Sequence, residues 1–132
     1  MNIASIIEPH PGDAVALVSR GRSTTYGELR SQVAALRGGL AGLGLKPGDR
    51  VGITCGNNWY FVVSYLAVTG VGCVAVPLNP LAPAPELERE LAVTGCRALI
   101  TGPSAEASVR ALDRGTLPTL EHVIAASGTE LS

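Results

Sequence analysis

The residues from 51 to 85 contain no Asp, Glu, Lys or Arg. A stretch this long without charge must be buried in a folded core or inserted into a membrane. A membrane-spanning helix needs about 20 predominantly apolar residues in succession. Gly70, Gly72 and Pro77 interrupt the stretch, and Val74 to Val76 favours a strand. We therefore expect a buried helix next to buried strands, and no membrane span.

The charge-free stretch is predicted to form a strand, a helix and a second strand. Their expected bounds are Arg50–Thr54, Asn58–Thr69 and Cys73–Pro77. Both strand segments are mostly apolar instead of alternating, as is typical of sheets that have helices on both faces. Two strands joined by a helix pair in parallel, with a right-handed crossover. This β-α-β unit is the predicted centre of the fold.

The segment before this unit is predicted to contain a hairpin and a long helix. Ala14–Ser19 has the composition of a strand, and Ser23–Thr25 is its expected hairpin partner. Thr25 and Glu28 form a capping box, in which each side chain satisfies a backbone N–H at the start of a helix. Apolar residues then recur every three or four positions until Gly44, which is expected to end the helix in a left-handed conformation.

The segment after this unit continues the alternation of helices and strands. We expect a helix at Pro85–Thr94 ended by Gly95, a strand at Arg97–Thr101, a short helix from a Ser104 cap to Leu112, and a strand at His122–Ala126. Alternating helices and strands predict an α/β fold with a doubly wound, mostly parallel sheet and flanking helices. A length of 132 residues is that of a single domain, which we expect to span residues 1–132.

Charge and cysteine content exclude several classes of function. Ten basic and eleven acidic residues give a net charge of −1, which argues against nucleic acid as a partner. Cys55, Cys73 and Cys96 have no metal-ligand spacing, so we expect buried free thiols and no metal site. Unpaired thiols together with an N-terminus that lacks a secretory signal favour a cytoplasmic protein.

Two asparagine positions follow predicted strands, where parallel sheets bind their ligands. Asn57 comes after the first strand of the central unit, and Asn79 follows the second. Both are weak candidates for cofactor binding. Ligand-free alternatives are that Asn58, of the pair Asn57-Asn58, caps the next helix, and that Asn79 forms a hydrogen-bonded turn before Pro80.

Other polar or glycine-rich positions favour structural roles. The glycine pairs around Leu43 and Val71 follow helices and precede strands, the reverse of a dinucleotide-binding loop, and are interpreted as helix caps. The loop Ser127–Glu130 resembles a phosphate loop, but Glu130 would repel an anion, so a solvated turn is expected. For His10 and His122 a structural role is expected, since neither has a catalytic partner beside it in the sequence. No catalytic residue is identified.

A series of short motifs resembles one protein family over roughly residues 12 to 126. The motifs are Thr25-Tyr26-Gly27-Glu28-Leu29, Gly44-Leu45-Lys46-Pro47-Gly48-Asp49-Arg50-Val51, Asn57, Gly72-Cys73-Val74-Ala75-Val76-Pro77-Leu78-Asn79-Pro80, Glu86-Leu87 and Ala98-Leu99-Ile100. Together they are similar to the N-terminal part of the adenylate-forming acyl-CoA synthetases, the AMP-binding superfamily. The Pro-Leu-Asn-Pro segment is most similar to the fatty-acid and aryl-acid CoA ligases.

The resemblance implies a parent enzyme that works in two steps. ATP and a carboxylic or fatty acid give an acyl-adenylate, and coenzyme A then displaces AMP, with Mg²⁺ screening the phosphates. The family's phosphate loop, adenine-binding segment, ribose-binding Asp, hinge and C-terminal lysine have no counterpart in these 132 residues. We therefore expect an N-terminal fragment that binds no cofactor and catalyses no adenylation alone.

Two further hypotheses remain open. The chain is either an interaction module that pairs with a separate catalytic lobe, or a small-molecule binding module that uses Asn57 and Asn79. A fragment of a larger fold leaves a sheet edge and an apolar face uncovered, which predicts marginal stability or self-association.

Overall fold

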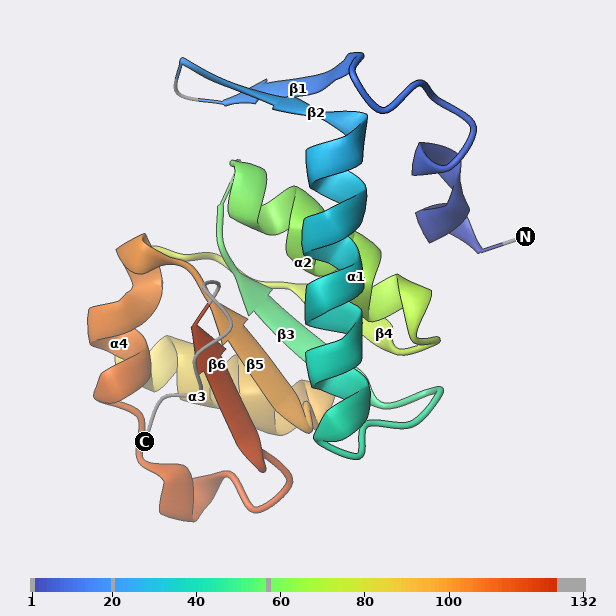
Figure 1. The fold of residues 1–132 in the computed structure, drawn as a ribbon. Coiled ribbons are helices and arrows are strands. Elements are labelled where there is room, and N and C mark those ends of the chain that lie inside the picture. Colours follow the sequence, from blue (N-terminus) through green and yellow to red (C-terminus); the bar gives the residue numbers. More distant parts are fainter. Residues whose placement is uncertain (1, 20, 57, 126–132) are drawn as a thin grey trace.

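The computed structural model describes residues 2–19, 21–56 and 58–125 (Figure 1). Six strands and four α-helices follow one another along this part of the chain, together with three short 3-10 helices. Their order is η1 (Ile3–Ile7), β1 (Val15–Ser19), β2 (Arg22–Thr25), α1 (Tyr26–Gly42), β3 (Arg50–Thr54), α2 (Trp59–Gly70), β4 (Val74–Pro77), α3 (Ala84–Thr94), β5 (Ala98–Thr101), η2 (Pro103–Ala105), α4 (Glu106–Arg110), η3 (Arg114–Thr116) and β6 (His122–Ala125).

Four of the strands form one parallel sheet in the order β4-β3-β5-β6. Val51 of β3 lies opposite Ala75 of β4 on one side and opposite Ala98 of β5 on the other. The predicted α/β fold and the central β3-α2-β4 unit are therefore confirmed. The predicted hairpin is also present, as an antiparallel pair of β1 and β2 that stands outside the parallel sheet.

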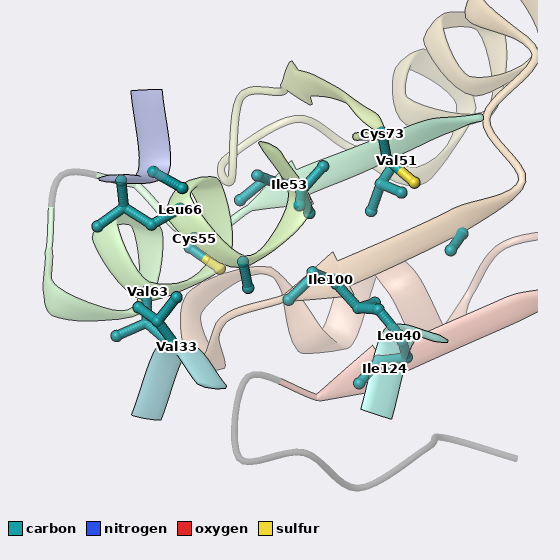
Figure 2. Packing of buried hydrophobic residues seen from close by; sticks show 14 of the residues in the cluster. Val33, Leu40, Val51, Ile53, Cys55, Val63, Leu66, Cys73, Ile100 and Ile124 are labelled. Atoms are coloured by element: carbon teal, nitrogen blue, oxygen red, sulfur yellow. The ribbon is translucent and has the colours of Figure 1, made fainter. Parts of the chain in front are cut away.

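Helices cover both faces of the parallel sheet (Figure 1). Alternate residues of β5 separate the two layers, because Ile100 packs with α1 and α2 whereas Leu99 packs with α3 and α4. Figure 2 shows the first layer, in which Leu40 of α1 lies near Ile100 and Ile124 of the sheet. Mostly apolar side chains fill both layers, which explains why β4, β5 and the residues of β3 after Arg50 carry no charge.

Most helix ends follow the predicted sequence signals. The Thr25 hydroxyl accepts a hydrogen bond from the Glu28 N–H at 3.2 Å, and a Glu28 carboxylate oxygen accepts one from the Thr25 N–H. Gly95 has a positive φ directly after α3, and Gly44 has one directly after Leu43, the C-cap residue of α1; a side chain would be strained at both. The capping box and the two glycine caps are thus confirmed.

The predicted helix from Ser104 to Leu112 is only partly correct. Its first turn is the 3-10 helix Pro103–Ala105, closed by the Ala105 N–H on the Gly102 carbonyl at 3.3 Å. Because Ser104 lies inside this turn, it is not placed to cap a helix, and α4 starts at Glu106 without a side-chain cap. The helix ends at Arg110, two residues earlier than expected.

Gly27 offers a sharp test of the packing between α1 and the N-terminal loop. Its N–H donates to the Gly12 carbonyl at 2.9 Å, and a Cβ at position 27 would lie 2.9 Å from that same oxygen. We expect Gly27→Ala to lower the free energy of unfolding by about 1–3 kcal/mol, because backbone must move to accept the methyl group. Chemical denaturation measures the change.

Gly38 in the same helix is the matched control. A Cβ built at position 38 meets no atom within 4 Å. Gly38→Ala should therefore raise the free energy of unfolding by about 0.5–1 kcal/mol, since alanine favours the helix and restricts the unfolded chain. Equal effects of the two substitutions would contradict the close approach at Gly27.

Candidate functional site

The carboxyl ends of the parallel strands meet at one edge of the sheet, where such folds bind ligands. The loops after β3 and β4 touch there, because a Cβ on Gly56 would lie 3.4 Å from Cγ of Pro80. A recess of about 390 Å³ lies between them, lined by Gly56, Phe61, Pro77, Leu78 and Pro80. These five residues carry no ionisable group, so the recess offers apolar contact but no acid, base or nucleophile.

The asparagine beside this recess caps α2. Oδ1 of Asn58 accepts a hydrogen bond from the Phe61 N–H at 3.3 Å, and its Nδ2 donates to the Cys55 carbonyl at 2.6 Å. Both ends of the amide are therefore used by the local backbone, which confirms the predicted cap. Asn57 lies outside the described residues, and its candidacy as a ligand-binding residue stays a prediction.

Asn79 shapes the turn that follows β4. Its Oδ1 accepts a hydrogen bond from the Leu81 N–H at 2.9 Å, and its carbonyl accepts one from the Ala82 N–H at 3.2 Å. This is the side-chain turn that asparagine commonly forms before a proline-rich segment. The turn places Pro80 next to Gly56. Both hydrogen bonds of Asn79 therefore have a structural role in this turn.

The three cysteines lie in the core as free thiols, as predicted. Burial raises the pKa of Cys55 to about 11, although the Ser64 hydroxyl at 3.9 Å opposes the shift. Burial likewise raises the pKa of Cys73 and of Cys96. The raised pKa values keep these thiols protonated at neutral pH, which makes them poor nucleophiles.

A polar cluster at the opposite edge of the sheet was not predicted. One guanidinium nitrogen of Arg97 donates to Asp49 at 2.7 Å and to the Gly44 carbonyl at 3.0 Å, and Nε contacts Glu121 at 3.0 Å. Asp49 also accepts the Lys46 N–H at 2.8 Å. The cluster joins the segments that lead into β3, β5 and β6 and borders a recess of about 420 Å³.

Neither the Arg97 cluster nor the recess at the carboxyl ends of the strands fits the Mg²⁺ ion and the ATP phosphates that the resemblance implies. Among residues 2–19, 21–56 and 58–125, no three His, Cys, Asp or Glu side chains gather as a potential metal site. Arg97 is already shared between two carboxylates, and the recess at the strand ends has no basic residue. We therefore assign the described residues no step of an ATP reaction. The loop Ser127–Glu130 lies outside the described residues.

A third recess lies between η1, β1 and the first turns of α1 and α2. Its volume is about 440 Å³, and its walls are aliphatic and aromatic, with Leu17, Phe61 and Tyr65 among them. His10 borders it and stacks on Tyr26, with ring centroids 4.2 Å apart. This contact gives His10 the structural role expected of it. Sequence periodicity gave no sign of the recess, since its residues come from four separate segments.

A sequence model described as "AMP-binding enzyme" matches residues 5–131. The chain belongs to this family. A feruloyl-CoA synthase of Amycolatopsis sp. is 38% identical to this AMP-binding family member over 111 residues, which are 84% of the chain and 22% of that protein. A mitochondrial medium-chain acyl-CoA ligase of Pongo abelii is 34% identical over 88 residues, which are 67% of the chain and 14% of that protein.

Solved structures support the same assignment. The anthranilate CoA ligase AuaEII, crystallised with anthranoyl-AMP, superposes with a TM-score of 0.87 at 28% identity, over 98% of this chain and 25% of that one. This AMP-binding family member thus spans about a fifth to a quarter of CoA ligases it resembles. In the part of the chain that the structure describes, no helix is both long and apolar enough to cross a bilayer.

The Asp49–Arg97 contact predicts a specific response to acid. The Lys46 N–H and then the Arg97 guanidinium lower the pKa of Asp49 below its ordinary value of 3.8. As the pH falls, the Asp49 carboxyl is therefore protonated first in the unfolded chain. The stabilisation of the folded state by this carboxylate is complete above pH 3.8 and is lost as the pH falls through the folded-state pKa. We expect Asp49→Asn to be less stable than the unchanged protein at neutral pH, with the difference shrinking below about pH 4.

Urea denaturation at several pH values measures this difference. Glu106→Gln is the control, because it removes only the exposed pair between Glu106 and Arg110 within α4. It should change the free energy of unfolding by less than about 0.5 kcal/mol at neutral pH. A destabilisation by Asp49→Asn that stays constant down to pH 2 would show that the carboxylate charge is not involved.

Proposed function

We propose that this chain is the N-terminal portion of an ATP-dependent carboxylic acid–CoA ligase. Such an enzyme forms an acyl-adenylate and pyrophosphate, and then transfers the acyl group to coenzyme A. The observation that carries the proposal is the joint match of sequence and fold to CoA ligases, over 84% of the chain in sequence and 98% in structure. The cytoplasm is the proposed location, supported by three free thiols in the core.

The class of acid is a finer part of the proposal. The Pro-Leu-Asn-Pro segment at residues 77–80 favours fatty or aryl acids by resemblance. The relatives named for feruloyl, anthranoyl and medium-chain acyl groups support a carboxylic acid of one of these two types. The two apolar recesses described above contain no Lys or Arg that could bind a carboxylate, so we infer that other residues of the ligase select the acid.

The proposed role of the described residues is to build a scaffold. The parallel sheet holds the ends of β3 and β4 in fixed register, and the Arg97 cluster ties the other ends of the strands together. On this proposal, the described side chains supply no acid, base or nucleophile for adenylation. We infer that the adenylation chemistry requires residues beyond these 132.

The isolated chain should therefore show no acid-dependent exchange between ATP and pyrophosphate. The measurement uses the purified 132-residue protein with ferulate, anthranilate and medium-chain fatty acids at saturating ATP and Mg²⁺. The Amycolatopsis feruloyl-CoA synthase serves as the positive control with ferulate. Robust exchange by the 132-residue protein would overturn the inference that its chemistry lies elsewhere.

Intact mass of the native product from its source complements this assay. A product several times longer than 132 residues supports the ligase proposal, and exchange should then be present in that product. A product that ends at Ser132 would instead favour the hypothesis that this chain pairs with a separately encoded catalytic lobe.

A second candidate function is the binding of a small molecule at the strand ends. The apolar recess between Gly56 and Pro80 favours it, since it lies at the usual ligand edge. On this hypothesis, Asn57→Ala weakens binding of an aromatic acid in calorimetry without lowering the melting temperature. Asn79→Ala weakens binding as well, but it also lowers the melting temperature because it removes the hydrogen bond from the Leu81 N–H. If Asn79→Ala lowers the melting temperature by a few degrees but leaves binding unchanged, the role of Asn79 is only to form its turn.

A further inference from the structure

The N-terminal segment from Asn2 to His10 forms a strap that is fastened at both ends. Its helix η1 packs against α1 and α2 (Figure 1). At one end, Nδ2 of Asn2 donates to the Thr69 carbonyl in the last turn of α2 at 2.6 Å. At the other end, one guanidinium nitrogen of Arg30 donates to the carbonyls of Ile7 and His10, at 3.0 and 2.9 Å. Polar contacts at its two ends therefore fix the position of the strap.

The side chains of the strap do not fill the space beneath its middle. The recess of about 440 Å³ lies there, between η1, β1 and the first turns of α1 and α2. Ala4 and Ile7 are buried, but Ile3 and Ile6 line the recess and are 48% and 53% exposed. Ligand pockets in proteins have volumes of roughly 300–1,000 Å³ and are mostly formed before the ligand binds. The fastened strap thus closes one side of a preformed recess of that size.

Two stacked pairs of rings form part of the wall of this recess. His10 stacks on Tyr26 with ring centroids 4.2 Å apart and an interplanar angle of 19°. Phe61 stacks on Tyr65 with centroids 5.8 Å apart and an angle of 20°. All four residues line the recess. Aromatic rings pack favourably on other rings in offset or edge-to-face geometry, so this wall favours an aromatic occupant.

The charge of the wall limits the occupant further. The residues that line the recess include no Asp, Glu, Lys or Arg. A charged group that entered it would lose its hydration without gaining an ionic partner, which is strongly unfavourable. The polar side-chain atoms of the lining belong to His10, Tyr26 and Tyr65, which can exchange a hydrogen bond with a hydroxyl group. The wall therefore fits a neutral molecule with an apolar body and a single hydroxyl group.

We propose that the recess beneath the N-terminal strap, here called the strap site, binds a neutral aromatic alcohol of one or two rings. An apolar cavity of roughly 150 Å³ is large enough for benzene, so the strap site at about 440 Å³ accommodates two fused rings. The rings of the ligand pack on Phe61 and Tyr65, and its hydroxyl group meets the polar atoms of the wall. The inference goes beyond the proposed function and does not rest on it, because that function uses these residues only as scaffold.

A neutral aromatic molecule fits the strap site better than a carboxylic acid or a peptide does. An acid would place its carboxylate in a wall without a basic Lys or Arg. A peptide would bring backbone N–H and C=O groups that need several partners. The carbonyls of Ile7 and His10 are not open to such a peptide, because both already accept hydrogen bonds from Arg30.

Calorimetry with two matched probes tests the strap site. 1-Naphthol is neutral, whereas 1-naphthoate carries a carboxylate on the same two rings. We expect the native product, isolated from its source, to bind 1-naphthol with a Kd of about 1 mM or lower, and at least roughly tenfold more tightly than 1-naphthoate. Absence of binding, or equal affinity for the two probes, would overturn the proposal. Binding by the 132-residue chain but not by a longer native product would also overturn it, because another segment of that product then fills the recess.

Methyl NMR shows where the probe lies. The methyl resonances of Ile6 and Leu17, which line the strap site, should shift when 1-naphthol is added. Leu78 lines the other apolar recess, at the carboxyl ends of the strands, and its methyl resonances should not shift. Shifts that are largest at Leu78 would place 1-naphthol at the strand ends and refute the strap site.

Two substitutions in β1 separate filling of the recess from general damage. Ala16 lines the strap site, so Ala16→Phe should occupy it and lower the affinity for 1-naphthol at least roughly tenfold, with a melting temperature within about 3 °C of the unchanged protein. Val18 on the same strand is 67% exposed and lies outside the described lining, so Val18→Phe should retain the affinity. Leu17→Trp is a second filling variant in case Ala16→Phe does not fold.

Unchanged affinity in a folded filling variant would contradict the proposal. An equal loss of affinity in Val18→Phe would contradict it as well, since that side chain adds nothing to the recess. Ligase activity is not measured in any of these experiments. A native product without ligase activity would therefore refute the proposed function and leave the result for the strap site as it stands.

Discussion

The position of β3 between β4 and β5 is the constraint on which the rest of the structure depends. Every residue of this strand after Arg50 is buried, and Val51 and Ile53 have no exposed surface. A strand that is paired on both edges and covered on both faces admits no charged side chain. Gly52 adds a limit on size, because a Cβ there would lie 3.0 Å from Leu99 and 3.1 Å from Leu78. The absence of charged residues in the sequence after Arg50 follows from this position of β3.

The two ends of the parallel sheet are stabilised by different kinds of interaction. At the carboxyl ends, proline and glycine residues pack with little polar contact, and the asparagine amides satisfy the backbone of their own loops. At the amino ends, Arg97 links Asp49 and Glu121 across three segments. The side chains of Arg97 and Asp49 are under a third exposed, so solvent screens this cluster only in part.

Local signals in the sequence predicted most of the fold but little of the polar geometry. The capping box at Thr25 and the glycine cap at Gly95 act within one helical turn, so their residues are adjacent in the sequence as well as in space. Arg97, in contrast, meets Asp49 across 48 positions, and only the pairing of β3 with β5 brings them together. Ser104 was misinterpreted because Pro103 starts a 3-10 turn that competes with a helical cap. The recess beside Tyr65 depends on four segments and has no pattern of its own.

The strand order has a consequence for the nascent chain. β3 can pair with β4 soon after both are synthesised, whereas its other edge stays unpaired until β5 is made. The separation in sequence is large, as the hydrogen bond from the Thr54 hydroxyl to the Ile100 carbonyl spans 46 residues. At about 5–20 residues per second, this edge stays unpaired on the ribosome for roughly 2–9 s. During that time no charged residue between positions 51 and 85 protects it from pairing with another chain. Slower translation of residues 85–101 would lengthen this interval, so the rate of synthesis sets how long the central strand is vulnerable to aggregation.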